Sequence, residues 1–111
     1  MEIQNQRQGA ITIIRPQGPL TSADADLVKT ALLDSAGASL GRVVLDLEAI
    51  PFVDSRGLEV LVEVTEEMSE GGQSLKLCAA NKTLREVLEL TAVAGLFEIF
   101  EDVGSAARSF L

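Results

Sequence analysis

The chain contains no histidine, tryptophan or tyrosine, and its 111 residues include a single cysteine. The absence of histidine removes the usual general base, the usual catalytic triads and most zinc sites. Cys78 cannot form an intramolecular disulfide, and its apolar neighbours indicate a buried strand thiol. A glycine-rich phosphate loop ending in Gly-Lys-Ser or Gly-Lys-Thr is also missing. An enzyme is the least favoured class, and we expect no catalytic residue, cofactor or bound metal.

Basic residues are scarce: nine Lys and Arg stand against 17 Asp and Glu, which gives a net charge of −8. Because affinity for nucleic acids comes mainly from basic contacts, we expect no direct binding to DNA or RNA, and a protein partner with a basic patch is favoured. No apolar run approaches the roughly 20 residues of a membrane span, and residues 1–9 lack the apolar core of a signal peptide. We expect one cytoplasmic domain over residues 1–111, without membrane insertion.

Strand and helix patterns alternate along the chain. Runs rich in β-branched residues, on either side of a turn at Arg7-Gln8-Gly9, predict an opening hairpin. We expect strands over residues 3–6, 10–15, 42–47, 75–79 and 96–100. We expect helices after a capping box at residues 21–24, over 55–70, from 81 or 82 to 91, and over 104–111. This order predicts an α/β fold with a mixed central sheet, opened by the hairpin and covered by about four helices.

Residues 43–62 are the most informative segment. They read as a buried strand, a connection in which Pro51 cannot continue the ladder, and the pair Asp54-Ser55 opening an amphipathic helix. The Ser55 hydroxyl is therefore expected at a helix N-terminus, where free backbone N–H groups and the helix dipole would hold a phosphate. On this local pattern alone, helix capping without further chemistry is the simpler interpretation.

The helix that starts at Ser55 has two predicted faces. The residues spaced for a core-facing stripe are Leu58, Leu61, Val62, Thr65 and Met68. The opposite side carries Glu59, Glu63, Glu66, Glu67 and Glu70. Val60 and Val64 fall off the stripe, and we expect them to be exposed among these glutamates. Such a face suits a partner surface and a merely solvated surface about equally well.

The same segment carries a family resemblance. Asp54-Ser55-Arg56-Gly57-Leu58, preceded by Leu45-Asp46-Leu47 and Phe52-Val53, resembles the signature of STAS domains, the family of bacterial anti-sigma factor antagonists. Gly18-Pro19-Leu20 resembles the family's turn before the first helix. The resemblance implies that an anti-sigma factor acting as a serine-protein kinase phosphorylates Ser55. The unphosphorylated domain would bind this kinase and release a sigma factor, and the phosphorylated domain would let go.

The resemblance also implies a partner surface around Ser55, and it is compatible with a homodimer. The expected surface residues are Leu20, Thr21, Ser22, Asp54, Ser55, Arg56, Gly57, Leu58, Glu59, Val60 and Glu63. Gly57 is expected to let another backbone or a kinase approach closely. Two positions depart from the family's pattern: Arg56 stands where a small residue is common, and Thr21 stands where kinase-dependent members commonly have aspartate. Arg56 could pair with a phosphate on Ser55 or obstruct a kinase.

Two other interpretations remain open. Residues 45–61 also resemble the phospho-aspartate segment of response-regulator receiver domains, with Asp46 as acceptor. That site needs further carboxylates after the first strand to hold magnesium, and residues 3–15 contain neither Asp nor Glu. The second alternative keeps the fold: a STAS subunit of a membrane transport complex that acts without phosphorylation.

Overall fold

The computed structural model of this chain describes residues 1–90 and 97–111. Its strands are β1 (Glu2–Gln8), β2 (Ile11–Gln17), β3 (Val43–Asp46), β4 (Lys76–Cys78) and β5 (Glu98–Phe100). Its helices are α1 (Ala25–Ala38), α2 (Ser55–Glu70), α3 (Lys82–Leu90) and α4 (Val103–Arg108). In the described part of the chain, no helix is both long enough and apolar enough to cross a membrane.

The strands form one sheet in the order β1-β2-β3-β4-β5. β1 and β2 are antiparallel and joined by a two-residue turn, in which Gly9 adopts a φ of 63°. The remaining neighbours are parallel, and each crossover between them contains a helix, as parallel strands require. The predicted α/β fold with a mixed sheet opened by a hairpin is confirmed.

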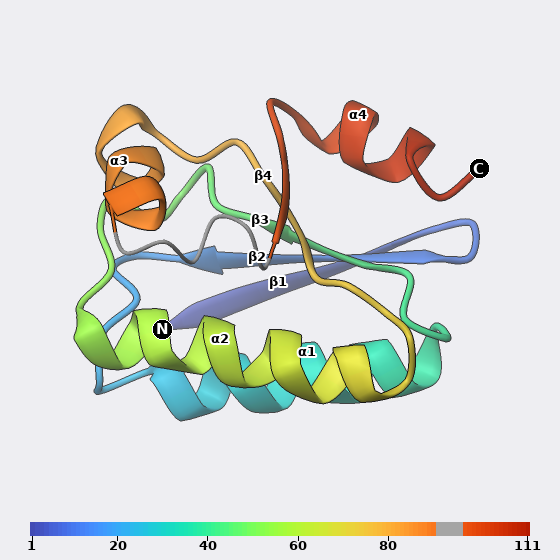
Figure 1. The fold of residues 1–111 in the computed structure, drawn as a ribbon, viewed down its shortest axis with the longest axis horizontal. Coiled ribbons are helices and arrows are strands. Elements are labelled where there is room, and N and C mark those ends of the chain that lie inside the picture. The colour runs from blue at the N-terminus through green and yellow to red at the C-terminus, as the bar shows by residue number, and fades with distance from the viewer. Residues whose placement is uncertain (91–96) are drawn as a thin grey trace.

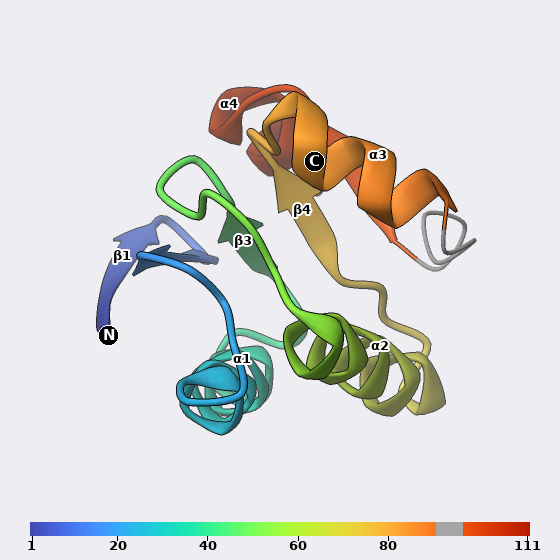
Figure 2. The same cartoon turned by 90° about the vertical axis from the view of Figure 1, so that its left-hand side faces the viewer.

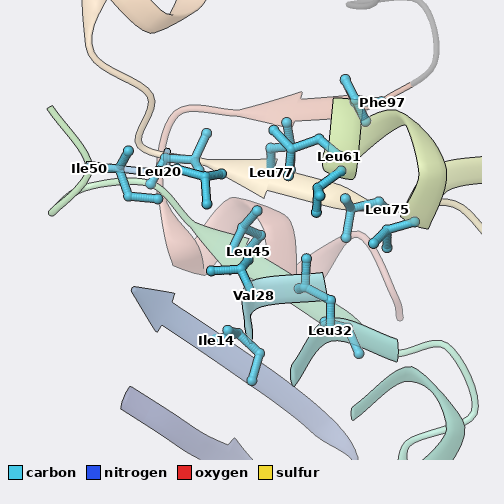
Figure 3. Packing of buried hydrophobic residues seen from close by; sticks show 14 of the residues in the cluster. Ile14, Leu20, Val28, Leu32, Leu45, Ile50, Leu61, Leu75, Leu77 and Phe97 are labelled. Atoms are coloured by element: carbon cyan, nitrogen blue, oxygen red, sulfur yellow. The ribbon is translucent and has the colours of Figure 1, made fainter. Parts of the chain in front are cut away.

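Helices cover both faces of the sheet. α1 and α2 lie side by side under one face, and α4 lies on the other (Figures 1 and 2). The main core joins central strands to the paired helices through side chains such as Ile14, Leu45 and Leu77, with Leu32 from α1 and Leu61 from α2 (Figure 3). A smaller cluster of Ile13, Val44, Cys78 and Ala106 lies under α4. Cys78 is buried, and this burial raises the pKa of its thiol to about 12.

Several predicted boundaries need correction. The expected capping box at residues 21–24 is absent: α1 starts at Ala25, and its N-cap residue Asp24 makes no side-chain cap. The chain turns there because the carbonyl of Thr21 accepts hydrogen bonds from the N–H groups of Asp24 and Ala25, at 3.0 and 2.8 Å. α4 begins at Val103, one residue before the predicted start, and ends at Arg108. The predicted helix end at 91 and strand start at 96 lie outside the described residues.

The two predicted faces of α2 are also partly wrong. Val60 and Val64 are fully buried, whereas Leu58 and Val62 are only half-buried. α2 packs against α1 as well as against the sheet, so its buried face is broader and turned relative to the predicted stripe. The buried residues are Gly57, Val60, Leu61, Val64, Thr65 and Met68.

Candidate phosphorylation and partner-binding site

Ser55 is the first residue of α2, and its side chain is exposed. The residue before it, Asp54, holds this helix start in place. One carboxylate oxygen of Asp54 accepts from the N–H of Gly57 at 2.8 Å, and the other accepts from the N–H of Ser22 at 2.9 Å. These hydrogen bonds, that of Gly57 first, lower the pKa of Asp54 and keep it ionised. A single carboxylate therefore caps α2 and ties the loop before α1 to it.

The loop at residues 19–22 lies beside Ser55, as the sequence predicts. The N–H of Leu20 donates to the carbonyl of Phe52 at 3.0 Å, and the N–H of Asp54 donates to the carbonyl of Leu20 at 3.1 Å. An isolated parallel bridge joins Leu20 to Val53. These backbone bonds place both segments at one end of the sheet, where the parallel strands have their carboxyl ends (Figure 1).

The prediction that Gly57 lets another backbone approach closely is confirmed, and that backbone is Leu20 of the same chain. A Cβ atom at this position would collide with the carbonyl oxygen of Leu20, which crosses α2 there. Glycine is needed for this approach of two segments of the same chain. The space beside Gly57 is filled by the protein itself, so the residue does not open a path for a kinase.

Three of the predicted surface residues are not on the surface. Leu20 and Val60 are fully buried, and Gly57 is buried beneath Leu20. The expectation that Val60 offers exposed contact area beside the serine is wrong, because its side chain belongs to the core. The exposed members of the predicted set are Ser22, Ser55 and Glu59, and the half-buried ones are Thr21, Asp54, Arg56, Leu58 and Glu63.

Arg56 is held by three carboxylates. Its guanidinium contacts Asp26 of α1 at 2.7 Å, Glu59 at 2.7 Å and Glu63 at 3.0 Å. These contacts, that of Asp26 first, raise the pKa of Arg56. Lys29 of α1 also contacts Glu63 at 3.0 Å, and the hydrogen bonds of Lys29 and Arg56 lower the pKa of Glu63. Arg56 thus links α1 to α2 and points at carboxylates that sequence reasoning did not connect with it.

Phe52 is a surface residue that sequence reasoning missed. It lies in the connection that leads into Asp54, and 49% of its surface is exposed. Its backbone carbonyl is bonded to Leu20, so the exposed ring is carried by a fixed backbone at the Ser55 end. A signal for it exists in the sequence. Phe52 directly follows Pro51, so it falls in the connection between the predicted strand and the predicted helix, outside the apolar patterns that predict the core.

Asp46, the acceptor in the receiver interpretation, is inaccessible. Its side chain is fully buried, and one of its oxygens binds the Nε of Arg15 at 2.7 Å. The other oxygen accepts from the N–H of Glu48 at 3.0 Å. A carboxylate committed in this way is not available to a phosphodonor, and this arrangement contradicts the receiver alternative.

The comparisons with known proteins agree with this fold. A family model described as the STAS domain matches residues 2–106. BtrV of Bordetella bronchiseptica, named a candidate anti-sigma factor antagonist, is 30% identical over 94 residues, which are 85% of this chain and 81% of that protein. The crystal structure of tm1081 from Thermotoga maritima, also described as a candidate anti-sigma factor antagonist, has a TM-score of 0.87 at 22% identity and covers 96% of this chain and 92% of that one. The phosphorylated form of SpoIIAA from Bacillus has a TM-score of 0.70 at 15% identity, with 97% of this chain and 99% of that chain covered. The chain belongs to the STAS domain family.

Proposed function

We propose that this chain is an anti-sigma factor antagonist, and that phosphorylation of Ser55 switches its binding to an anti-sigma factor with serine kinase activity. The observation that carries the proposal is an exposed serine hydroxyl on a helix start that Asp54 fixes through two hydrogen bonds. The name of BtrV and the phosphorylated state of SpoIIAA support it. The role requires no catalysis by this chain, and its proposed place is the cytoplasm.

Phosphorylation would act on this site as a change of charge. A phosphate adds a charge of about −1.5 to −2 at neutral pH. Ser55 lies next to Asp54 and within one helical turn of Glu59, and the nearest cation, Arg56, is already bound to three carboxylates. The phosphate would therefore add to an existing negative field. A partner surface that contacts a neutral hydroxyl would lose that contact and meet an uncompensated charge.

The proposed contact surface follows from exposure. It consists of Ser22, Ser55 and Glu59, with Thr21 at its edge and Phe52 as its apolar member. Exposed aromatic rings in fixed positions are common anchors of protein interfaces. The carboxylates around it favour a basic patch on the partner, which would accelerate association at low ionic strength.

Affinity capture with purified chain tests this function. The native chain, Ser55→Asp and the control Ser69→Asp, which alters an exposed serine near the other end of α2, serve as baits in cytoplasmic extract of the source organism, and mass spectrometry identifies the retained proteins. We expect the native chain and Ser69→Asp to retain a protein with a kinase ATP-binding domain, and Ser55→Asp to lose it. Retention of the same partner by Ser55→Asp would contradict the switch, and retention of a transport ATPase in place of a kinase would contradict the function.

A further inference from the structure

The end of the molecule opposite Ser55 has an unusual residue at the close of α1. Leu40 follows the C-cap residue Ser39, has a φ of 55° and is 73% exposed. The N–H of Gly41 donates to the carbonyl of Ala36 at 2.8 Å, which closes the helix in a Schellman arrangement with Leu40 at the left-handed position. Glycine usually occupies this position, because a Cβ is disfavoured there. A large apolar side chain is thus held in water by a strained backbone.

Three surface hollows meet at this leucine. One of about 270 Å³ lies between the ends of α1 and α2, and Leu33 and Met68 line it together with Leu40. A second of about 320 Å³ extends from Leu40 to Phe110. A third of about 160 Å³ lies between Leu40 and the hairpin. Figure 1 shows the hairpin turn, the end of α1 and the C-terminus gathered at this end of the molecule.

The charged residues that line these hollows are mainly basic, although the chain as a whole is acidic. Arg42 lines two of them, Arg7 lines one, and Lys76 lines another, whereas Glu67 is the acidic residue that lines them. Lys76 is paired with Glu98 at 3.0 Å. Within the described residues, the guanidinium groups of Arg7 and Arg42 make no ion pair. A chain with a net charge of −8 therefore presents two uncompensated cations beside its exposed leucine.

We propose that Leu40 and its hollows, flanked by Arg7 and Arg42, form a second docking surface, which binds an acidic peptide segment of a partner protein. An apolar side chain of that segment would pack against Leu40, and its carboxylates would pair with Arg7 and Arg42. This surface differs in sign from the Ser55 end, where a basic partner is favoured. It requires no phosphorylation, and it does not depend on the function proposed above.

Two-dimensional NMR of the ¹⁵N-labelled chain tests this surface directly. The probe is a synthetic acetylated peptide, Glu-Leu-Asp-Leu-Glu amide. In the control peptide, lysine replaces each acidic residue. We expect saturable shifts confined to the amides of residues near Leu40, Arg42 and Gly72 with the acidic peptide, and none with the basic one. Shifts with both peptides, or with neither, would overturn the proposal.

Two pairs of variants identify the residues that bind. Leu40→Gly keeps the backbone shape and should weaken binding of the acidic peptide at least tenfold, whereas Leu27→Ala, which alters an exposed leucine within α1, should not. The double variant Arg7→Gln, Arg42→Gln should remove binding, whereas Arg85→Gln should leave it unchanged. Native affinity of Leu40→Gly for the acidic peptide would overturn the proposal. Shifts of the same amides when the protein concentration is raised without peptide would also overturn it, because they would identify a second copy of the chain as the occupant.

Discussion

The carbonyl oxygen of Leu20 lies where the side chain of residue 57 would begin, and the absence of a Cβ on Gly57 allows this contact. The same carbonyl oxygen accepts a hydrogen bond from the N–H of Asp54 at 3.1 Å. The loop before α1 and the first turn of α2 are therefore assembled as one unit, and the position of Ser55 depends on a contact between residues far apart in sequence.

Gly57→Ala should destabilise the domain by about 1–3 kcal/mol, the usual cost of forcing extra volume into a packed site. Alanine favours a helix interior over glycine by about 1 kcal/mol, so the loss is expected despite better helix propensity. Urea unfolding followed by circular dichroism measures it. Gly37→Ala in α1 is the matched control: a Cβ there meets nothing within 4 Å, and that variant should be stabilised.

Asp54→Asn should make the stability of the domain less dependent on acid pH. In the folded chain the pKa of Asp54 is lowered by the N–H groups of Gly57 and Ser22. Its stabilising contribution is therefore present above the ordinary Asp pKa of about 3.9 and is lost as the pH falls through the lower folded-state pKa. Urea midpoints measured between about pH 2 and pH 6 provide the test, with Asp34→Asn as control. Parallel curves for native chain and Asp54→Asn would argue against this linkage.

The phosphate of Ser55-phosphorylated chain should report on Arg56. Asp26 raises the pKa of Arg56 more than any other group does, so Asp26→Asn should leave more of the positive charge of the guanidinium uncompensated. We expect the second phosphate pKa, ordinarily about 6, to fall in Asp26→Asn and to rise in Arg56→Ala, since a nearby cation favours the dianion. Phosphorus NMR titrations of the three phosphoproteins measure these shifts. Superimposable titrations would mean that Arg56 stays with α1 and does not sense the phosphate.

Leu40→Gly should stabilise the domain. The left-handed conformation costs a leucine about 1–2 kcal/mol, and the glycine variant loses part of this gain through the greater entropy of its unfolded chain. A net gain of about 0.5–1 kcal/mol is expected, because the leucine side chain is mostly in water and little burial is lost. Thermal and urea unfolding measure it. Leu40→Ala shortens the side chain but keeps the strain, so this control should gain nothing; equal effects of both substitutions would contradict the assignment of strain.

Local chemistry in the sequence predicted much of the fold. The hairpin turn and the capping aspartate before Ser55 both depend on only a few residues. Asp54 lies where expected, whereas the turn lies at residues 9–10, because Arg7 and Gln8 of the predicted turn belong to β1. The burial of Val60 was not predictable in this way, because it depends on where α1 packs beside α2. The contact of Leu20 with Gly57 joins segments 37 positions apart, and no local pattern encodes it.

In the candidate site, too, local features were predictable from the sequence and contacts between distant segments were not. The exposure and the helix-start position of Ser55 follow from the sequence of its own segment. The partners of Arg56 do not, since Asp26 belongs to another helix and its carboxylate is one of many on an acidic chain. For Phe52, the neighbouring Pro51 marked an irregular segment in the sequence, but the 49% exposure of the residue depends on how the folded chain packs around it.

The 16 residues of α2 separate its two ends by about 24 Å at 1.5 Å per residue. Electrostatic screening at physiological ionic strength acts over about 8 Å, so a phosphate on Ser55 and an acidic ligand at Leu40 would hardly sense each other's charge. The two ends would then act as independent inputs. Occupation of one would not bias the affinity of the other, and the domain could join two proteins in either order while only one of those junctions responds to a kinase.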